Sequence, residues 1–228
     1  MKNILVVDIG GTNVKLMISR AEKRKFDSGP RLSPRQLVAG IKAAAADWKY
    51  DAIAIGFPAP VKEGRIVKDP KNLSKGWTGW DFRKSLGKPV RVINDAAMQA
   101  LGSFHGGRML FLGLGTGLGS AMVWPRTVLQ LELSDLPYPG VTKLEDCLGK
   151  AALAEMGRKA WMREVEEVVV RMKLAFIADY VVLGGGNAKN FSKAPPGAEL
   201  GHNRNAYLGG CRLWETDPAT RRPKWQIL

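Results

Sequence analysis

Ile4-Leu-Val-Val-Asp-Ile-Gly-Gly-Thr-Asn-Val-Lys15 is the stretch of the chain that decides the fold. Its first six residues are almost all branched and apolar, which predicts a buried β-strand over 4–9. Two glycines then allow a tight turn, and residues 14–19 form a second apolar run, so the stretch predicts a β-hairpin. The chain therefore opens on a strand, a glycine turn and a second strand.

The turn of this hairpin has the composition of a phosphate-binding loop. Glycines bring backbone N–H groups close to an anion, and Thr12 and Asn13 add side-chain donors. A plain hairpin turn would need only the glycines, so the added polar residues favour phosphate binding. Asp8, at the end of the strand, is a candidate Mg²⁺ ligand acting through water. The candidate phosphate-binding residues here are Asp8, Gly10, Gly11, Thr12, Asn13 and Lys15.

A second stretch of the same style, Gly113-Leu-Gly-Thr-Gly-Leu-Gly119, separates apolar runs at 109–112 and 120–124. It is not a dinucleotide fingerprint, because Leu118 stands where that pattern needs glycine, and it lacks the Gly-Lys-Ser/Thr of a P-loop. Alone it is a weak signal. Paired with the first hairpin, it predicts two loops that grip a phosphate chain from opposite sides. Its candidate phosphate-binding residues are Gly115, Thr116 and Gly117.

This coarse duplication predicts an N-terminal lobe over 1–107 and a C-terminal lobe over 108–228, each with one phosphate hairpin. Ser33, Pro34 and Gln36 predict a capped helix start. The further elements expected are a helix to about residue 48, strands at 51–57, 89–94 and 180–183, helices at 95–101 and 205–214, and two helices within 144–176 that meet near 157. Residues 58–82 predict a long loop, and the basic tail after 217 predicts a frayed end.

Two further polar positions follow predicted strands. A carboxylate at Asp95 can accept a proton from an alcohol nucleophile, although Asn94-Asp95 also has the composition of a helix cap. The run Gly184-Gly-Gly-Asn187 follows a buried strand and leaves room for a flat base such as adenine, although a simple strand-to-helix turn would have the same letters. Both alternatives stay open from the residues alone.

The chain of 228 residues carries a net charge of +14, and the charge is uneven. Residues 1–107 hold 19 of the 35 Lys and Arg but 9 of the 21 Asp and Glu, a net of +10. Such an excess favours polyanionic partners, while a merely basic, soluble surface is the alternative. The basic and aromatic residues 71–82 could stack nucleic-acid bases, but a sugar pocket combined with core packing is the favoured interpretation, so nucleic acid is not expected.

Cysteine content and hydropathy narrow the class of protein. Cys147 and Cys211 show no pairing pattern and no Cys-x-Cys or Cys-x-x-Cys spacing, so neither a disulfide framework nor a tetrahedral zinc site is expected. No apolar run approaches the roughly 20 residues that span a bilayer, so a membrane is not expected as a partner. Residues 1–3 lead straight into the first strand without a signal-peptide layout, which favours the cytoplasm.

The order of motifs resembles the ROK family of sugar kinases over nearly the whole chain. The five motifs are Asp8-Ile-Gly-Gly-Thr-Asn-Val-Lys15, Gly56-Phe-Pro-Ala-Pro-Val61, Asn94-Asp-Ala-Ala97, Gly113-Leu-Gly-Thr-Gly117 and Leu183-Gly-Gly-Gly-Asn187. Lys71-Asn-Leu-Ser-Lys-Gly-Trp77 and Leu144-Glu-Asp-Cys-Leu-Gly-Lys-Ala-Ala-Leu153 resemble the polyphosphate/ATP-dependent glucokinase branch. The basic excess and the absence of zinc ligands fit the same branch.

The resemblance implies an α/β protein of the actin-like ATPase (ribonuclease H-like) fold, with two lobes around a cleft. It implies that Asp95 is the general base that activates the sugar hydroxyl. The residues that it implies for sugar binding are Asn72, Asn94, Asp95 and Glu132. Those that it implies for nucleotide binding are Gly184, Gly185, Gly186 and Asn187.

The chain departs from the family in the segment that follows Glu132. Glu132-Leu-Ser-Asp135 resembles the family's Glu-Leu-Gly-His segment, but Asp135 replaces the histidine, and a carboxylate cannot donate as a neutral imidazole does. A second string, Glu199-Leu-Gly-His202, copies the letters of the motif after the glycine run, and we interpret it as coincidence.

The resemblance implies a kinase that transfers a phosphoryl group from ATP, inorganic polyphosphate or both to the 6-hydroxyl of glucose, with Mg²⁺ and without zinc. The alternatives are a kinase for mannose, fructose or an N-acetylhexosamine, and a non-catalytic sugar or polyanion sensor. An intact Asp95 argues against a sensor, which needs no base. The implied partners are the small-molecule sugar and the donor, with a homodimer as a further arrangement found in the family.

Overall fold

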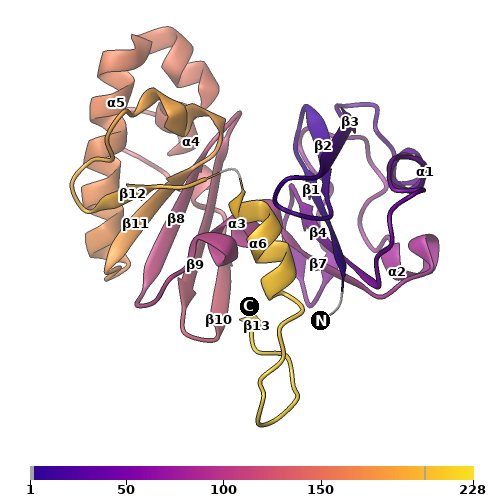
Figure 1. Ribbon diagram of the computed structural model, residues 1–228. Coiled ribbons are helices and arrows are strands. Elements are labelled where there is room, and N and C mark those ends of the chain that lie inside the picture. Colours follow the sequence, from indigo (N-terminus) through magenta and orange to yellow (C-terminus); the bar gives the residue numbers. More distant parts are fainter. Residues whose placement is uncertain (1–2, 203) are drawn as a thin grey trace.

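The computed structural model describes residues 3–202 and 204–228, which form two large β-sheets with two helices between them (Figure 1). Met1 and Lys2, which belong to the start of the chain that was interpreted as lacking a signal-peptide layout, lie outside the described residues. Within the described residues, no helix combines the length and apolar character needed to cross a bilayer.

The first sheet has the strand order β3-β2-β1-β4-β7. Its strands are β1 (Ile4–Ile9), β2 (Asn13–Met17), β3 (Lys23–Asp27), β4 (Ala52–Phe57) and β7 (Val90–Asn94). The β1–β2 hairpin is antiparallel, as the sequence predicts, while β1, β4 and β7 run parallel. Every residue of β1 and β4 is buried, because elements cover both faces of the sheet.

The second sheet repeats this plan in the order β12-β11-β8-β9-β10-β13. Its strands are β8 (Met109–Leu114), β9 (Leu118–Trp124), β10 (Thr127–Leu131), β11 (Tyr180–Gly184), β12 (Ala198–Leu200) and β13 (Gln226–Ile227). The β8–β9 hairpin is antiparallel and β11 runs parallel to β8, so the second glycine turn occupies the same place in its sheet as the first. Strands β10, β12 and β13 were not predicted, because β12 and β13 are very short and the sequence of β10 shows little alternation.

Helices cover the outer faces of the two sheets and fill the space between them (Figure 1). On the first lobe lie α1 (Pro34–Ala44) and α2 (Phe82–Leu86), and on the second lie α4 (Glu145–Leu148) and α5 (Lys150–Ala175). Helix α1 starts with the predicted capping box but ends four residues before the expected 48. Within α5, Gly157 has a non-helical conformation (φ 77°, ψ 161°), which places the predicted junction of two helical segments at that residue.

Helices α3 (Asp95–Ser103) and α6 (Asn205–Arg212) cross between the two sheets (Figure 1). They approach so closely that a Cβ at Gly102 would lie 1.8 Å from the carbonyl oxygen of Asn205. A Cβ at Gly209 would likewise lie 1.8 Å from the carbonyl oxygen of Met98. The close crossing therefore requires glycine on both helices.

Two expectations about irregular segments were wrong. The segment 58–82, expected as a long loop, contains a small hairpin of β5 (Val61–Lys62) and β6 (Arg65–Ile66). The Trp77 side chain in this segment is fully buried against Phe57 and contributes core packing. The tail after Asp217 is not frayed: Arg126 pairs with Asp217, and β13 pairs with β10.

Candidate active site

A cleft of about 630 Å³ lies between the two lobes, and both glycine turns open into it. Its walls combine residues from the first turn, the loop after β6, the start of α3, the second turn, the η1 segment (Leu133–Asp135) and the η2 segment (Gly186–Asn190). The predicted site residues that line it are Gly10, Gly11, Thr12, Asn13, Lys15, Asn72, Asn94, Asp95, Gly115, Thr116, Gly117, Glu132, Gly185, Gly186 and Asn187. Asp8 and Gly184 lie behind this surface.

The first glycine turn is short because β1 passes directly into β2. The backbone N–H of Gly10 donates to the carbonyl of Asn13 at 3.0 Å, and Asp8 and Lys15 are register partners on the two strands. Their side chains form an ion pair at 3.6 Å, with Asp8 buried and Lys15 about half exposed. Lys15 therefore extends from the turn toward the cleft, where a cation can meet a phosphate.

The second glycine turn is also closed by a backbone hydrogen bond, but a shorter-range one: the N–H of Gly115 donates to the carbonyl of Gly117 at 3.0 Å. Asn187 donates its side-chain amide to the carbonyl of Gly115 at 3.0 Å. The predicted nucleotide run is thereby joined to the predicted phosphate turn. This contact follows from the parallel pairing of β8 with β11, which aligns the ends of the two strands.

The glycines of the nucleotide run have different neighbours. A Cβ at Gly184 would lie 2.4 Å from the ring of Phe111, and one at Gly185 would lie 2.4 Å from the carbonyl of Leu114. Packing against β8 therefore explains glycine at these two positions. Gly186 has open space around it, so it and Asn187 are the members of the run best placed to face a ligand.

Asn94 and Asp95 stand at the junction of β7 and α3, so both alternatives for this pair have structural support. The side chain of Asn94 caps α3 by accepting from the N–H of Ala97 at 3.1 Å. Asp95 has a carboxylate at the cleft surface that accepts from the N–H of Ala96 at 2.8 Å. The Asn94 cap fixes where α3 begins, and this start of the helix places the Asp95 carboxylate at the cleft.

The electrostatics of the cleft single out Asp95. Burial, together with the negative charges of Asp8 and Glu132, raises its pKa from the ordinary 3.8 to about 7. Burial also raises the pKa of Asp8, against the opposing effect of Lys15, and raises the pKa of Glu132. Carboxyl groups whose pKa lies near neutrality are suited to proton transfer at neutral pH.

The residues at the first turn fit a magnesium ion held through water. Mg²⁺ keeps several waters and binds one or two carboxylates together with substrate phosphates. Asp8 offers one buried carboxylate whose pKa remains raised despite Lys15, so its negative charge is incompletely offset. In residues 3–202 and 204–228, no three His, Cys, Asp or Glu side chains are grouped so as to hold a metal by themselves.

Several polar residues in or beside the cleft were missed by the sequence analysis, because residues of these types are common on any protein surface. Gln130 of β10 accepts from the N–H of Asn94 at 2.9 Å and donates to the carbonyl of Val61 at 2.6 Å, so it bridges the two lobes. Glu145 at the start of α4 accepts from the N–H of Leu118 at 3.4 Å. The other additional polar residues of the cleft are Lys68, Asp69, Lys71, Gln99, Ser120, Asp135, Lys150 and Lys189.

The second Glu-Leu motif lies away from the predicted sugar residues. Glu199 and Leu200 form the edge strand β12, and the Glu199 carboxylate lies 3.0 Å from the ring of His105. His202 lines a smaller pocket of about 320 Å³ beside Gly186, Lys189 and Phe191. The interpretation of this string as coincidence stays a prediction.

Two facing sheets, each with a glycine hairpin at a common cleft, define a protein of the actin-like ATPase fold. A solved structure with this fold is the inorganic polyphosphate/ATP-glucomannokinase of Arthrobacter sp. strain KM, with a TM-score of 0.77 and 21% identity over 92% of this chain and 97% of that one. The ROK family model matches residues 4–130. The chain belongs to the ROK family.

Two curated relatives show how far the sequence similarity extends. The polyphosphate glucokinase of Mycobacterium tuberculosis is 25% identical over 158 residues, which cover 63% of this chain and 59% of that protein. The kanosamine kinase of Amycolatopsis mediterranei is 25% identical over 172 residues, covering 67% of this chain and 53% of that protein. The chain thus matches little more than half the length of these relatives.

Proposed function

We propose that this protein is a sugar kinase that transfers a phosphoryl group from ATP or inorganic polyphosphate to the 6-hydroxyl of glucose. The observation that carries the proposal is the Asp95 carboxyl, with a pKa of about 7, in a cleft between two glycine turns. Family membership and the names of the polyphosphate-using relatives support the same reaction. A sensor would need neither the base nor the second turn.

The proposed chemistry assigns each part of the cleft one task. Asp95 accepts the proton of the sugar hydroxyl. As it does so, the hydroxyl oxygen of the sugar bonds to the terminal phosphorus of the donor, and the bond from that phosphorus to the leaving phosphate oxygen breaks. Asn72, on the first lobe, and Glu132, on the second, hold other hydroxyls of the sugar. The two turns donate backbone N–H groups to the phosphates, and approach of the lobes excludes water that would otherwise compete as acceptor.

Mg²⁺, when bound, would neutralise the phosphates of the donor, and Asp8 is the residue that would hold it through water. The buried position of Asp8 beneath the first turn keeps its charge close to the phosphate position without placing it on the cleft surface. Lys15, 3.6 Å from Asp8, supplies a positive charge at the same turn.

The pH dependence follows from the raised pKa of Asp95. The base must be ionised, so kcat/KM for the sugar is expected to rise with pH through a midpoint near 7. Because the charge of Asp8 contributes to the raised pKa, Asp8→Asn is expected to move the midpoint of the remaining activity downward. The measurement is a pH–rate profile for both proteins from about pH 5 to 9. An unchanged midpoint in Asp8→Asn would contradict this assignment.

The donor is tested by comparing polyphosphate with ATP across a salt series at fixed Mg²⁺, with glucose 6-phosphate as the readout. The cleft carries five lysines that can meet a long polyanion: Lys15, Lys68, Lys71, Lys150 and Lys189. Between 0.1 and 1 M salt the Debye length falls from about 10 Å to 3 Å, so dispersed attractions weaken. Polyphosphate-driven activity is expected to fall more steeply than ATP-driven activity.

A matched pair of variants on one helix sharpens this comparison. Lys150→Met removes a lysine of the cleft, whereas Lys159→Met removes one from the same helix outside the cleft. Only Lys150→Met is expected to reduce the salt sensitivity of the polyphosphate reaction. Product with ATP but none with polyphosphate at low salt would leave an ATP-dependent kinase, and no product with either donor over a panel of hexoses would remove the proposed function.

A further inference from the structure

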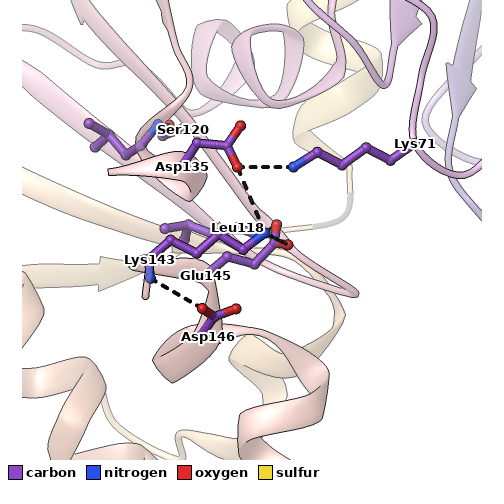
Figure 2. Close-up of polar contacts among 8 residues, drawn as sticks. Lys71, Leu118, Ser120, Asp135, Lys143, Glu145 and Asp146 are labelled. Carbon is purple, nitrogen blue, oxygen red and sulfur yellow. Dashed lines mark hydrogen bonds and ion pairs between the residues drawn. The ribbon is translucent and has the colours of Figure 1, made fainter. Parts of the chain in front are cut away.

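A chain of ion pairs crosses the mouth of the cleft (Figure 2). Lys71, on the first lobe, places its Nζ 3.1 Å from Asp135 Oδ1, at the end of η1 on the second lobe. Lys143 lies 3.8 Å from the same oxygen and 3.2 Å from Glu145 Oε1. Four side chains of alternating charge therefore connect the loop after β6 with the start of α4.

One end of this chain adjoins the predicted sugar site. Lys71 directly precedes Asn72, and a Cβ at Gly11 would lie 3.3 Å from the Cβ of Asn72, so the loop rests against the first glycine turn. Asp135 donates its backbone N–H to the carbonyl of Glu132 at 3.3 Å. The Lys71–Asp135 pair therefore lies beside both Asn72 and Glu132, which come from opposite lobes.

The other end adjoins the second glycine turn. Glu145 Oε2 accepts from the N–H of Leu118 at 3.4 Å, and a Cβ at Gly117 would lie 2.3 Å from the same oxygen. Lys143, which pairs with Glu145, is itself held because its backbone N–H donates to Asp146 at 3.1 Å. The position of the turn that faces the donor phosphates is thus tied to Lys143 and, through it, to Asp135.

The two inner members of the chain, Asp135 and Lys143, are each stabilised in the charged form by a neighbour. The hydrogen bond from Lys71 lowers the pKa of Asp135, and the hydrogen bond to Glu145 raises the pKa of Lys143. The Lys71 and Asp135 side chains are 55% and 51% exposed, so as an isolated pair they would contribute little. The position of the pair gives it a further effect, because it connects the two lobes. Closer approach of the lobes would shield the pair from water and strengthen it.

We propose that Asp135 is a positioning residue that couples sugar binding to donor binding through the chain Lys71–Asp135–Lys143–Glu145. Sugar bound between Asn72 and Glu132 holds the two lobes at the spacing at which Lys71 and Asp135 pair. Asp135 then holds Lys143 and Glu145, and Glu145 holds the second turn in position for the donor phosphates. This inference rests on the proposed function, and it gives the aspartate that replaces the family's histidine a task of its own.

The test measures how strongly one ligand changes the affinity for the other. The dissociation constant of glucose, or of the best sugar of the panel, is measured calorimetrically with and without a non-hydrolysable ATP analogue. In the wild-type protein the analogue is expected to tighten sugar binding by about fivefold or more, within the usual range for coupled sites. In Asp135→Asn this factor is expected to fall toward one.

Two further variants separate coupling from general damage. Lys71→Met combined with Asp135→Asn is expected to lose no more coupling than Asp135→Asn alone, because both changes break the same pair. Lys224→Met is the matched control, since Lys224 pairs with Glu215 at the same 3.1 Å but outside the cleft, and it is expected to keep the wild-type factor. Coupling that survives in Asp135→Asn would overturn the inference while leaving turnover, and thus the proposed function, intact. Absence of turnover with every sugar would instead remove the proposed function.

Discussion

Asp95→Asn is expected to lower kcat by about 10²–10⁴-fold, the usual contribution of a general base, while sugar binding persists. Asparagine keeps the shape of the side chain and can still accept from the N–H of Ala96, as Asp95 does at 2.8 Å, but it cannot take up the proton of the hydroxyl. The measurements are kcat with saturating sugar and donor, and the dissociation constant of the sugar by calorimetry. A variant that kept more than about a tenth of the wild-type kcat would show that Asp95 is not the base.

The stability of Asp95→Asn distinguishes lost chemistry from lost folding. Asp95 releases its proton near 3.8 in the unfolded chain but near 7 in the folded protein. Between these values the folded state binds more protons, so the contribution of Asp95 to stability falls as the pH rises. Asp95→Asn is therefore expected to melt at or above the wild-type temperature at pH 8, and the difference is expected to shrink as the pH falls toward 4. A lower melting temperature at pH 8 would argue against this electrostatic account.

Gly209→Ala is expected to destabilise the protein by at least about 2 kcal/mol. Alanine favours a helix over glycine by about 1 kcal/mol, which acts in the opposite direction. The clash is larger, because the new Cβ would lie 1.8 Å from the backbone oxygen of Met98, and no flexible side chain can move aside. Overpacking of this kind costs about 1–3 kcal/mol or more, so α3 and α6 must separate.

Thermal unfolding measures this effect, with Gly186→Ala as the control. A loss of 2 kcal/mol corresponds to a fall in Tm of about 4–8 °C for a protein of this size. A Cβ at Gly186 would enter open space, so Gly186→Ala is expected to keep the wild-type Tm. Equal melting temperatures for wild type and Gly209→Ala would mean that the two helices are not in close contact.

The parts of the molecule that the sequence predicted are those whose cause is local. A strand, a glycine turn and a second strand lie within a dozen residues, so the hairpins around Gly10 and Gly115 could be recognised before any contact was known. The capping box of α1 and the interruption of α5 at Gly157 are local in the same sense. Asp95 could be identified because both its position after a predicted strand and its family motif can be read directly from the sequence.

The parts that only the tertiary structure decided depend on residues far apart in the chain. Nothing in the sequence indicates that Lys71 and Asp135 pair, and the packing of the two lobes brings their side chains within 3.1 Å of each other. Gln130 bridges the two lobes only because folding brings β10 within hydrogen-bonding distance of Asn94 and Val61. For residues 71–82 the sequence predicted a sugar pocket combined with core packing, and only the tertiary structure shows that Trp77 belongs to the core cluster. The raised pKa of Asp95 likewise arises from burial together with the charges of Asp8 and Glu132. These three residues come from separate chain segments, and their distances are set by how the two sheets pack, so no local sequence pattern could have predicted the shift.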